Sequence, residues 1–256
     1  MLGHRRFGEG ASRALVFNDW LSDTSSWDGA LPLLEASSVS WCLTDLRGYG
    51  RSLDRSGTFT VEEAAADALA LADSLGWDRF SVVGHSMSSL VAVHIAQTVP
   101  ERVGRVVLLC PPPPRGFGYD ASTLAAVEAV ARGDDSQRER FVRFVLGDRL
   151  ARGFAKLKAA QWRATAHPDA VAAYVKMFGV RGLPDATIEV RCPVLAVTGG
   201  RDAEAMRRDA VTRGFGALAS KLEAVELAEC GHYPMQEAAP WLIGVIERFL
   251  TDAQSE

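Results

Sequence analysis

The sequence predicts an α/β protein with a mostly parallel sheet, and three observations support this fold class. Short apolar runs of strand length alternate along the chain with longer segments of helical periodicity. Glycine and proline mark the ends of many of these segments. The 256 residues, with 48% hydrophobic and 23% charged residues, suit one large soluble domain or one domain with a modest insertion.

Six apolar runs are the predicted strands. Each is four to eight residues long and is bounded by polar, glycine or proline residues, as buried strands usually are. The four consecutive prolines at 111–114 close the fourth run, because proline cannot donate to a strand ladder. The predicted strands are 14–17, 40–44, 80–83, 103–110, 193–198 and 222–227.

Helical patterns lie between these runs. Thr60 followed by Glu63 is typical of a capping box, and the helix it opens is predicted to end at Gly76. A second helix begins after residue 86 and is stopped by Pro100. The last helix, 240–250, places most of its large apolar residues on one face.

The pattern changes between residues 115 and 185, where no strand-like run occurs. Four helical patterns fill this region, with candidate breaks at Gly147 and at His167-Pro168. We therefore predict a core made of 1–114 and 186–256, with a helical insertion at 115–185. The four helical patterns are 122–132, 136–146, 150–164 and 169–178.

Charge and composition limit the classes of substrate and partner that this protein is expected to bind. A net charge of −4 gives no basic face for nucleic acid, and a neutral or apolar small molecule is the expected substrate. No apolar stretch approaches the length of a membrane span, and the N-terminus lacks the apolar segment of a secretory signal. We expect a cytoplasmic protein, and the sequence makes no prediction of its oligomeric state.

The four cysteines are widely separated and form no C-x-x-C pair. They are Cys42, Cys110, Cys192 and Cys230, and most of them lie in or beside apolar runs. This placement favours buried free thiols. No cysteine and histidine cluster has metal-ligand spacing, so we expect no metal site.

Ser86 is the central candidate residue. It stands in Gly84-His85-Ser86-Met87-Ser88, directly between a predicted strand and a predicted helix. A serine on such a sharp turn can be held with its hydroxyl above the sheet edge and the helix N-terminus behind it. The Gly-x-Ser triplet alone is a weak signal, and the strand-then-helix context gives it weight.

Two further residues complete a catalytic pattern. Asp202 follows the strand 193–198 in Thr-Gly-Gly-Arg-Asp, and His232 follows the last strand in Cys-Gly-His-Tyr-Pro. Ser86, Asp202 and His232 thus occur in the chain order of a nucleophile-elbow enzyme, each after a strand. Asp120 is an alternative acid, but the proline run places it deep in a loop.

On these residues the sequence resembles the α/β-hydrolase superfamily, in particular its smaller capped esterase-like members. The segment Asp45-Leu-Arg-Gly-Tyr-Gly-Arg-Ser52 is similar to the family's D-x-R-G-x-G-x-S turn, and 231–237 is similar to the stretch around the family's histidine. The resemblance implies the α/β-hydrolase fold, a helical cap formed by 115–185, and no cofactor. It also implies that the strands that usually begin the fold are shortened here.

One departure concerns the oxyanion hole. The family has His-Gly where this chain has Asn18-Asp19, and the spacing to Trp27 implies that the backbone N–H of Trp20 is one oxyanion donor. The N–H of Met87 would be the other. Asp19 replaces a glycine, and its carboxylate would oppose a developing oxyanion unless it points away or is solvated.

The leading interpretation is therefore a serine hydrolase that acts on a carboxylic ester, thioester or lactone. Ser86 would be the nucleophile, His232 the base and Asp202 the residue that orients the base. Aromatic residues of the cap, such as Phe117, Tyr119, Trp162 and Phe178, predict a mostly apolar pocket. The altered Asn18-Asp19 turn leaves two alternatives: a lyase or C–C bond-cleaving enzyme, and a ligand receptor on the same scaffold.

Overall fold

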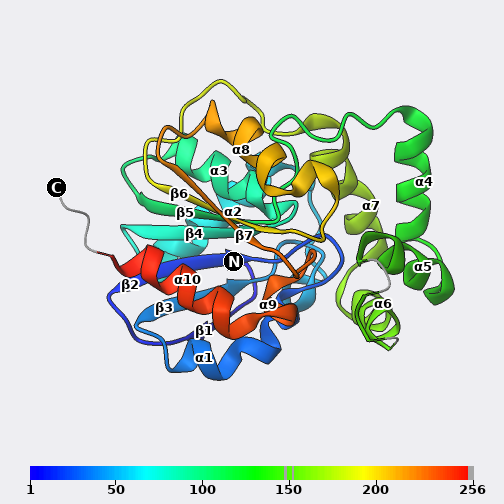
Figure 1. Cartoon of the computed structure of the whole chain (residues 1–256), viewed down its shortest axis with the longest axis horizontal. Coiled ribbons are helices and arrows are strands. Elements are labelled where there is room, and N and C mark those ends of the chain that lie inside the picture. The colour runs from blue at the N-terminus through cyan, green and yellow to red at the C-terminus, as the bar shows by residue number, and fades with distance from the viewer. Residues whose placement is uncertain (147–148, 152, 253–256) are drawn as a thin grey trace.

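The computed structural model describes residues 1–146, 149–151 and 153–252, so the predicted break at Gly147 lies outside the described residues. Within these residues the strands form one sheet in the order β1-β3-β2-β4-β5-β6-β7 (Figure 1). All neighbouring strands are parallel except β1 and β3. The strands are β1 (His4–Phe7), β2 (Ser12–Phe17), β3 (Val39–Thr44), β4 (Phe80–His85), β5 (Val103–Leu109), β6 (Val194–Gly199) and β7 (Leu222–Leu227).

The six predicted strands are all present, and the prediction of an α/β fold with a mostly parallel sheet is confirmed. The central strands are buried on both faces, which explains why they read as continuous apolar runs. Only a short β1 precedes β2, as expected from the few residues available there. Its sequence, His-Arg-Arg-Phe, carries no apolar run that could have predicted it.

Helices cover both faces of the sheet (Figure 1). Helices α2, α3 and α8 lie on one face, and α1 and α10 lie on the other. The short helices η1 (Thr24–Ala30), η2 (Gly50–Ser52), η4 (Glu204–Met206) and α9 (Pro234–Glu237) occupy connections. The covering helices are α1 (Leu31–Glu35), α2 (Val61–Ser74), α3 (Ser88–Thr98), α8 (Arg208–Gly216) and α10 (Ala239–Thr251).

The start of α2 corrects one detail of the predicted capping box. The Thr60 side chain accepts from Glu63 N as expected. The Glu63 carboxylate, however, accepts from the backbone N–H groups of Thr58 and Phe59 and not from Thr60. Phe59 has a φ of 54°, and this bend brings the preceding N–H groups toward the carboxylate.

The region between β5 and β6 is helical, and its helices lie beyond one edge of the core in Figure 1. They pack as two pairs, α5 with α6 and α4 with α7. His167 caps α7 with its side chain, at the predicted His-Pro break. The helices are α4 (Ala121–Ala131), α5 (Asp135–Leu146), α6 (Phe154–Thr165), α7 (Pro168–Lys176) and the π-turn η3 (Met177–Arg181).

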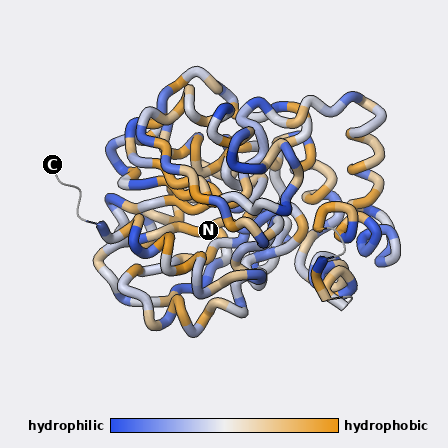
Figure 2. The backbone as a smooth tube through the Cα atoms, viewed as in Figure 1, coloured by the Kyte–Doolittle hydropathy of each residue, from blue (hydrophilic) through white to orange (hydrophobic). Residues whose placement is uncertain are grey.

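The hydrophobic core follows the sheet and continues into the helical insertion. Hydropathic colouring places the most apolar segments on the central strands (Figure 2). Trp20 joins the two parts, because its ring centroid lies 5.4 Å from that of Trp162 and 5.4 Å from that of Phe178. No helix within the described residues is long and apolar enough to cross a membrane.

Candidate active site

Ser86 stands on a strained turn between β4 and α3. Its φ is 54°, in the left-handed region that non-glycine residues rarely adopt, at a cost of about 1–3 kcal/mol. The turn is held from both sides: Ser86 N donates to Leu109 O at the end of β5 (2.8 Å), and Ser89 N donates to Ser86 O (3.0 Å). The backbone strain is therefore fixed by the neighbouring strand and by the first turn of α3.

Close packing around this turn explains its small residues. A Cβ on Gly84 would lie 2.4 Å from Ser88 O and 2.5 Å from Ser89 Cα, so no larger residue fits without moving α3. Ser88 is another small residue of this turn. Its hydroxyl turns back to the strand, accepting from His85 N (2.9 Å) and donating to His85 O (3.0 Å).

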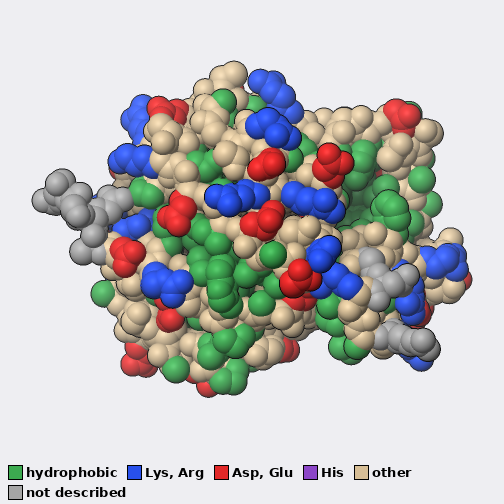
Figure 3. Space-filling view, in the orientation of Figure 1, with side chains coloured by type: hydrophobic (Ala, Val, Ile, Leu, Met, Phe, Trp, Pro, Cys, Tyr) green, Lys and Arg blue, Asp and Glu red, His purple; other side chains and the backbone are tan. Residues whose placement is uncertain are grey.

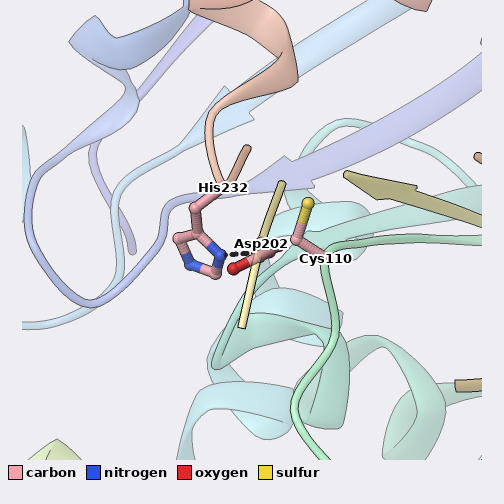
Figure 4. A group of neighbouring side chains, drawn as sticks. All are labelled: Cys110, Asp202 and His232. Carbon is pink, nitrogen blue, oxygen red and sulfur yellow. Dashed lines mark hydrogen bonds and ion pairs between the residues drawn. The ribbon is translucent and has the colours of Figure 1, made fainter. Parts of the chain in front are cut away.

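Asp202 and His232 are brought together from two different strand ends. Asp202 Oδ2 accepts a hydrogen bond from His232 Nδ1 at 2.8 Å, and both side chains are buried (Figure 4). Burial acts to raise the Asp202 pKa, but the charge and hydrogen bond of His232 outweigh it and hold this pKa below its ordinary value. Burial acts to lower the His232 pKa, yet Asp202 raises it above the usual histidine range.

The bond to Asp202 fixes which nitrogen of His232 is available. Because Nδ1 is engaged, Nε2 is the nitrogen left for a proton transfer. The loop is fixed by Glu237, which accepts from the backbone N–H groups of Gly231 (2.8 Å) and Tyr233 (3.1 Å). His85 also holds this loop, because its Nε2 donates to the carbonyl oxygen of His232 (2.7 Å). Burial lowers the His85 pKa to about 4, so His85 is neutral there.

Ser86 and His232 line the same cavity. Within the described residues no hydrogen bond links the Ser86 hydroxyl to His232. Catalytic hydrogen bonds are often long without substrate and tighten when it binds. The three predicted catalytic residues are thus gathered at the carboxyl ends of the strands, with the Asp202–His232 bond already formed.

The segment that carries Trp20 is held by both parts of the molecule. Tyr49 OH donates to Trp20 O (2.9 Å), and the Trp20 indole Nε1 donates to Val171 O of α7 (2.8 Å). Asn18 Oδ1 accepts from Leu46 N (2.8 Å), which ties the turn to the segment 45–52. Trp20 lines the cavity beside Ser86, whereas Met87 is buried next to Ser86 in the chain.

Asp19 does not project freely into the site. It is 1% exposed, and its carboxylate accepts hydrogen bonds from Leu21 N, Ser22 Oγ and Tyr233 OH. Burial acts to raise its pKa, but the positive charge of Lys158 and the hydrogen bond from Tyr233 hold that pKa below its ordinary value. The carboxylate is therefore ionised and directed toward these donors.

The cavity has a volume of about 600 Å³ and lies between the strand ends and the helical insertion. Figure 3 shows a hollow bordered by hydrophobic side chains in this region. Phe117, Tyr119 and Phe178 line it, in keeping with the predicted apolar pocket, and the Phe117 and Tyr119 rings are stacked at 5.5 Å. Trp162 lies behind Trp20 instead of in the cavity wall. Phe144 of α5 is 82% exposed at the wall.

Two residues at the site were not predicted from the sequence. Cys110 follows β5 and has a φ of 46°. Its sulfur lies within 4.8 Å of a carboxylate oxygen of Asp202 and of a ring nitrogen of His232, and Figure 4 shows the three side chains. Lys158, a buried lysine of α6, donates to Ser22 and Ser26 (2.8 Å each). The alternative acid Asp120 is exposed and caps α4 through Thr123 N, away from His232.

A mostly parallel sheet with a strained serine turn after a central strand, and a buried Asp–His pair at later strand ends, defines the α/β-hydrolase class. The family model described as alpha/beta hydrolase fold matches residues 17–200, which is more than half of the chain. The chain therefore belongs to the alpha/beta hydrolase fold family.

Relatives in this family differ in activity. The chain is 32% identical over 111 residues to a 2-heptyl-3-hydroxy-4(1H)-quinolone dioxygenase of Mycobacteroides abscessus, covering 40% of this chain and 39% of the relative. It is 28% identical over 210 residues to a pimeloyl-[acyl-carrier protein] methyl ester esterase of Vibrio parahaemolyticus, covering 77% and 78%. The chain spans less than half the length of the dioxygenase and of the next five curated relatives.

Among solved structures, the enol-lactonase from Burkholderia xenovorans superposes with a TM-score of 0.83. The two chains are 22% identical, and the match covers 98% of this chain and 96% of the lactonase. This likeness supports the fold, including the helical insertion, and not the activity.

Proposed function

We propose that the protein is a serine hydrolase that cleaves a small, largely apolar carboxylic ester, thioester or lactone through an acyl-serine intermediate. The observation that carries the proposal is the pairing of a strained serine turn with a buried Asp–His hydrogen bond at one cavity. The esterase match over 77% of the chain supports the same reaction class.

In the proposed mechanism His232 Nε2 accepts the Ser86 hydroxyl proton while Ser86 Oγ forms a bond to the substrate carbonyl carbon. Collapse of the tetrahedral intermediate breaks the bond to the leaving group, which takes the proton from Nε2. Water then attacks the acyl-serine with the same proton transfers in the second half-reaction. Asp202 keeps the imidazole in the required tautomer and stabilises the imidazolium.

The oxyanion donors in this proposal are the backbone N–H groups of Trp20 and Met87. Neither group makes any of the turn and loop hydrogen bonds found in the described part of the chain. Loss of one such donor typically costs about 3 kcal/mol of transition-state stabilisation. The bonds that Trp20 makes to Tyr49 and Val171 hold its peptide in place.

The aromatic and aliphatic cavity wall supports an apolar small-molecule substrate. Phe117, Tyr119, Phe141 and Phe178 are among the rings that line the cavity, and Arg201 at the wall is paired with Glu229 (3.1 Å). A volume of about 600 Å³ is in the usual range for a small-molecule site.

Ser86→Ala tests the proposal on a panel of p-nitrophenyl esters from acetate to octanoate. We expect wild-type turnover to fall by about a thousandfold or more, because the nucleophile is removed. Ser56→Ala, which removes an exposed serine hydroxyl, should retain wild-type rates. A Ser86→Ala variant that keeps full turnover on a genuine substrate would exclude the acyl-serine mechanism.

A second candidate is a non-hydrolytic reaction in which His232 takes a proton from the substrate itself. The match of 40% of the chain to a dioxygenase supports this alternative. The two functions differ in their need for the serine. Base chemistry at His232 would survive Ser86→Ala, whereas acyl transfer would not.

A further inference from the structure

Lys158 is buried at 1% exposure although it belongs to α6 of the helical insertion. Its ammonium group donates three hydrogen bonds, to Ser22 Oγ (2.8 Å), Ser26 Oγ (2.8 Å) and Gln161 Oε1 (3.0 Å). All three acceptors are neutral. A fully buried ammonium needs a negative charge nearby as well, because neutral acceptors replace only part of its hydration.

That negative charge comes from Asp19, through Ser22. Ser22 Oγ accepts from Lys158 and donates to Asp19 Oδ1 at 3.2 Å. The carboxylate and the ammonium thus interact across one hydroxyl without forming a direct ion pair. Asp19 precedes Trp20 in the chain, so this relay ends at the peptide that carries the proposed oxyanion donor.

Tyr233 contacts both Lys158 and Asp19. Its ring lies 4.0 Å from the Lys158 ammonium, and its hydroxyl donates to Asp19 Oδ2. Tyr233 is also the residue after His232. One lysine of the insertion therefore contacts both the segment after Trp20 and the loop that carries the base, and it reaches Asp19 through Ser22.

We infer that Lys158 is a positioning residue, which compensates the Asp19 carboxylate and holds the Trp20 turn so that its N–H can stabilise an oxyanion. This inference rests on the proposed acyl-transfer function. It explains how the chain tolerates a carboxylate where the family has glycine. A negative charge beside a developing oxyanion opposes the reaction, and a buried cation linked to that carboxylate through Ser22 cancels much of its field.

The groups that face Lys158 set its protonation. Asp19 and Asp23 lie on the segment before η1, His85 lies at the end of β4, and Tyr233 precedes α9. Burial lowers the Lys158 pKa to about 8, against the opposing effect of Asp19 and Asp23. His85 is neutral at this pH, and the Tyr233 pKa is raised well above its ordinary value by burial. Lys158 is thus the group of this cluster that loses its charge near pH 8.

The test compares wild type with three variants: Lys158→Met, the double variant Asp19→Asn with Lys158→Met, and the control Lys156→Met. Lys156 is an exposed lysine on the same helix. We expect Lys158→Met to lower kcat about 10- to 100-fold with KM changed little, since the uncompensated Asp19 carboxylate then opposes the oxyanion and displaces its donor while substrate contacts are kept. The double variant should recover to within about threefold of wild type, because no uncompensated charge remains.

The pH profile separates this role from a purely structural one. Wild-type kcat should fall as pH rises through about 8, where Lys158 loses its proton and Asp19 stays ionised. The double variant should lack this alkaline decline. If Lys158→Met does not fold, the profiles of wild type and double variant still decide the matter.

Three results would overturn the inference. Wild-type-like kcat in Lys158→Met would exclude it, and so would a double variant as slow as Lys158→Met or one that keeps the alkaline decline. In each case wild type still hydrolyses esters, so the proposed function stands. Wild-type protein that neither hydrolyses esters nor reacts at Ser86 would instead exclude the proposed function, and the inference with it.

Discussion

Two buried carboxylates bond to neighbouring residues of the His232 loop and have different tasks. Asp202 accepts directly from the imidazole, whereas Asp19 accepts from the neighbouring Tyr233 hydroxyl. Both have a pKa below the ordinary value, because nearby positive charge and hydrogen bonds outweigh burial. Both therefore remain ionised at neutral pH, and only Asp202 is placed to orient the base.

The raised His232 pKa gives a prediction for the pH dependence. The base must be neutral to accept the Ser86 proton, so kcat/KM should fall as pH drops through a pKa above the usual histidine value. Asp202→Asn removes the charge that raises this pKa. We expect it to lower kcat about a thousandfold or more and to move the acidic limb to lower pH.

The measurement is a kcat/KM profile from pH 5 to 9 for wild type and Asp202→Asn. Asp209→Asn is a suitable control, since Asp209 is an exposed residue at the start of α8. An acidic limb at the same pH in all three proteins would contradict the account of Asp202.

At the scale of single residues, the sequence predicts a candidate catalytic residue where the neighbouring residues mark the end of a predicted strand. Ser86, Asp202 and His232 each follow a predicted strand, and parallel strands bring their carboxyl ends to one edge. Lys158 and Cys110 carry no such signal. Lys158 meets Ser22 across 136 residues, and this pairing depends on how α6 docks on the core.

At the scale of elements, the β4–turn–α3 unit positions the nucleophile. Strand β4 pairs with β5 through His85 and Leu109, and Ser86 N continues this ladder by one bond. The helix then starts immediately, with Gly84 packed against its first residues. The strained, half-buried serine is a consequence of these two neighbours.

Gly84→Ala tests that dependence. The new Cβ would meet the backbone of Ser88 and Ser89 at about 2.5 Å, so α3 must shift. We expect a loss of about 1–3 kcal/mol in the free energy of unfolding, together with lower activity. Gly216→Ala, at the end of α8 with no atom within 4 Å of its Cβ, should be neutral or stabilising by up to about 1 kcal/mol.

Urea unfolding at constant protein concentration measures both variants. Equal stability of Gly84→Ala and wild type, with unchanged ester hydrolysis, would show that the turn does not depend on close packing.

The predicted helices and strands agree with the structure where the apolar periodicity is strong. They agree less well where tertiary contacts determine whether a segment forms a helix or a strand. The strand at 222–227 is found at the predicted residues, and the insertion helices begin within a few residues of their predicted starts. The residues of strand β1 carry no apolar signal that would place it, because its pairing with β3, not its composition, makes it a strand. Helices α8 and α9 follow turns whose lengths the apolar pattern does not encode.

At the scale of the whole molecule, the helical insertion forms one wall of the cavity and the strand ends form the other. Val127 and Phe141 come from the insertion, while Ser86, Met206 and His232 come from the core. The sequence predicts an apolar pocket, but not which aromatic residues face it, because that choice depends on the packing of α4 and α5. The predicted boundaries at 115 and 185 stay a prediction.

Insertion and core are joined at several points close to the site. His167 N donates to Gly48 O (2.7 Å), and Trp20 bonds to Val171 O (2.8 Å). Lys158 adds a buried contact to the segment after Trp20. The insertion therefore belongs to the site, and a probe for Ser86 must be small enough to pass beneath it.

The most direct test of the central claim is labelling of Ser86 by a small fluorophosphonate such as diisopropyl fluorophosphate, read by intact mass and peptide mapping. The reagent needs an activated serine and little substrate recognition. We expect a single adduct on Ser86, no adduct in Ser86→Ala, and labelling at least about a hundredfold slower in His232→Ala. No adduct on wild-type protein whose circular dichroism shows it folded, or an adduct that forms equally fast without His232, would contradict the account of Ser86 as an activated nucleophile.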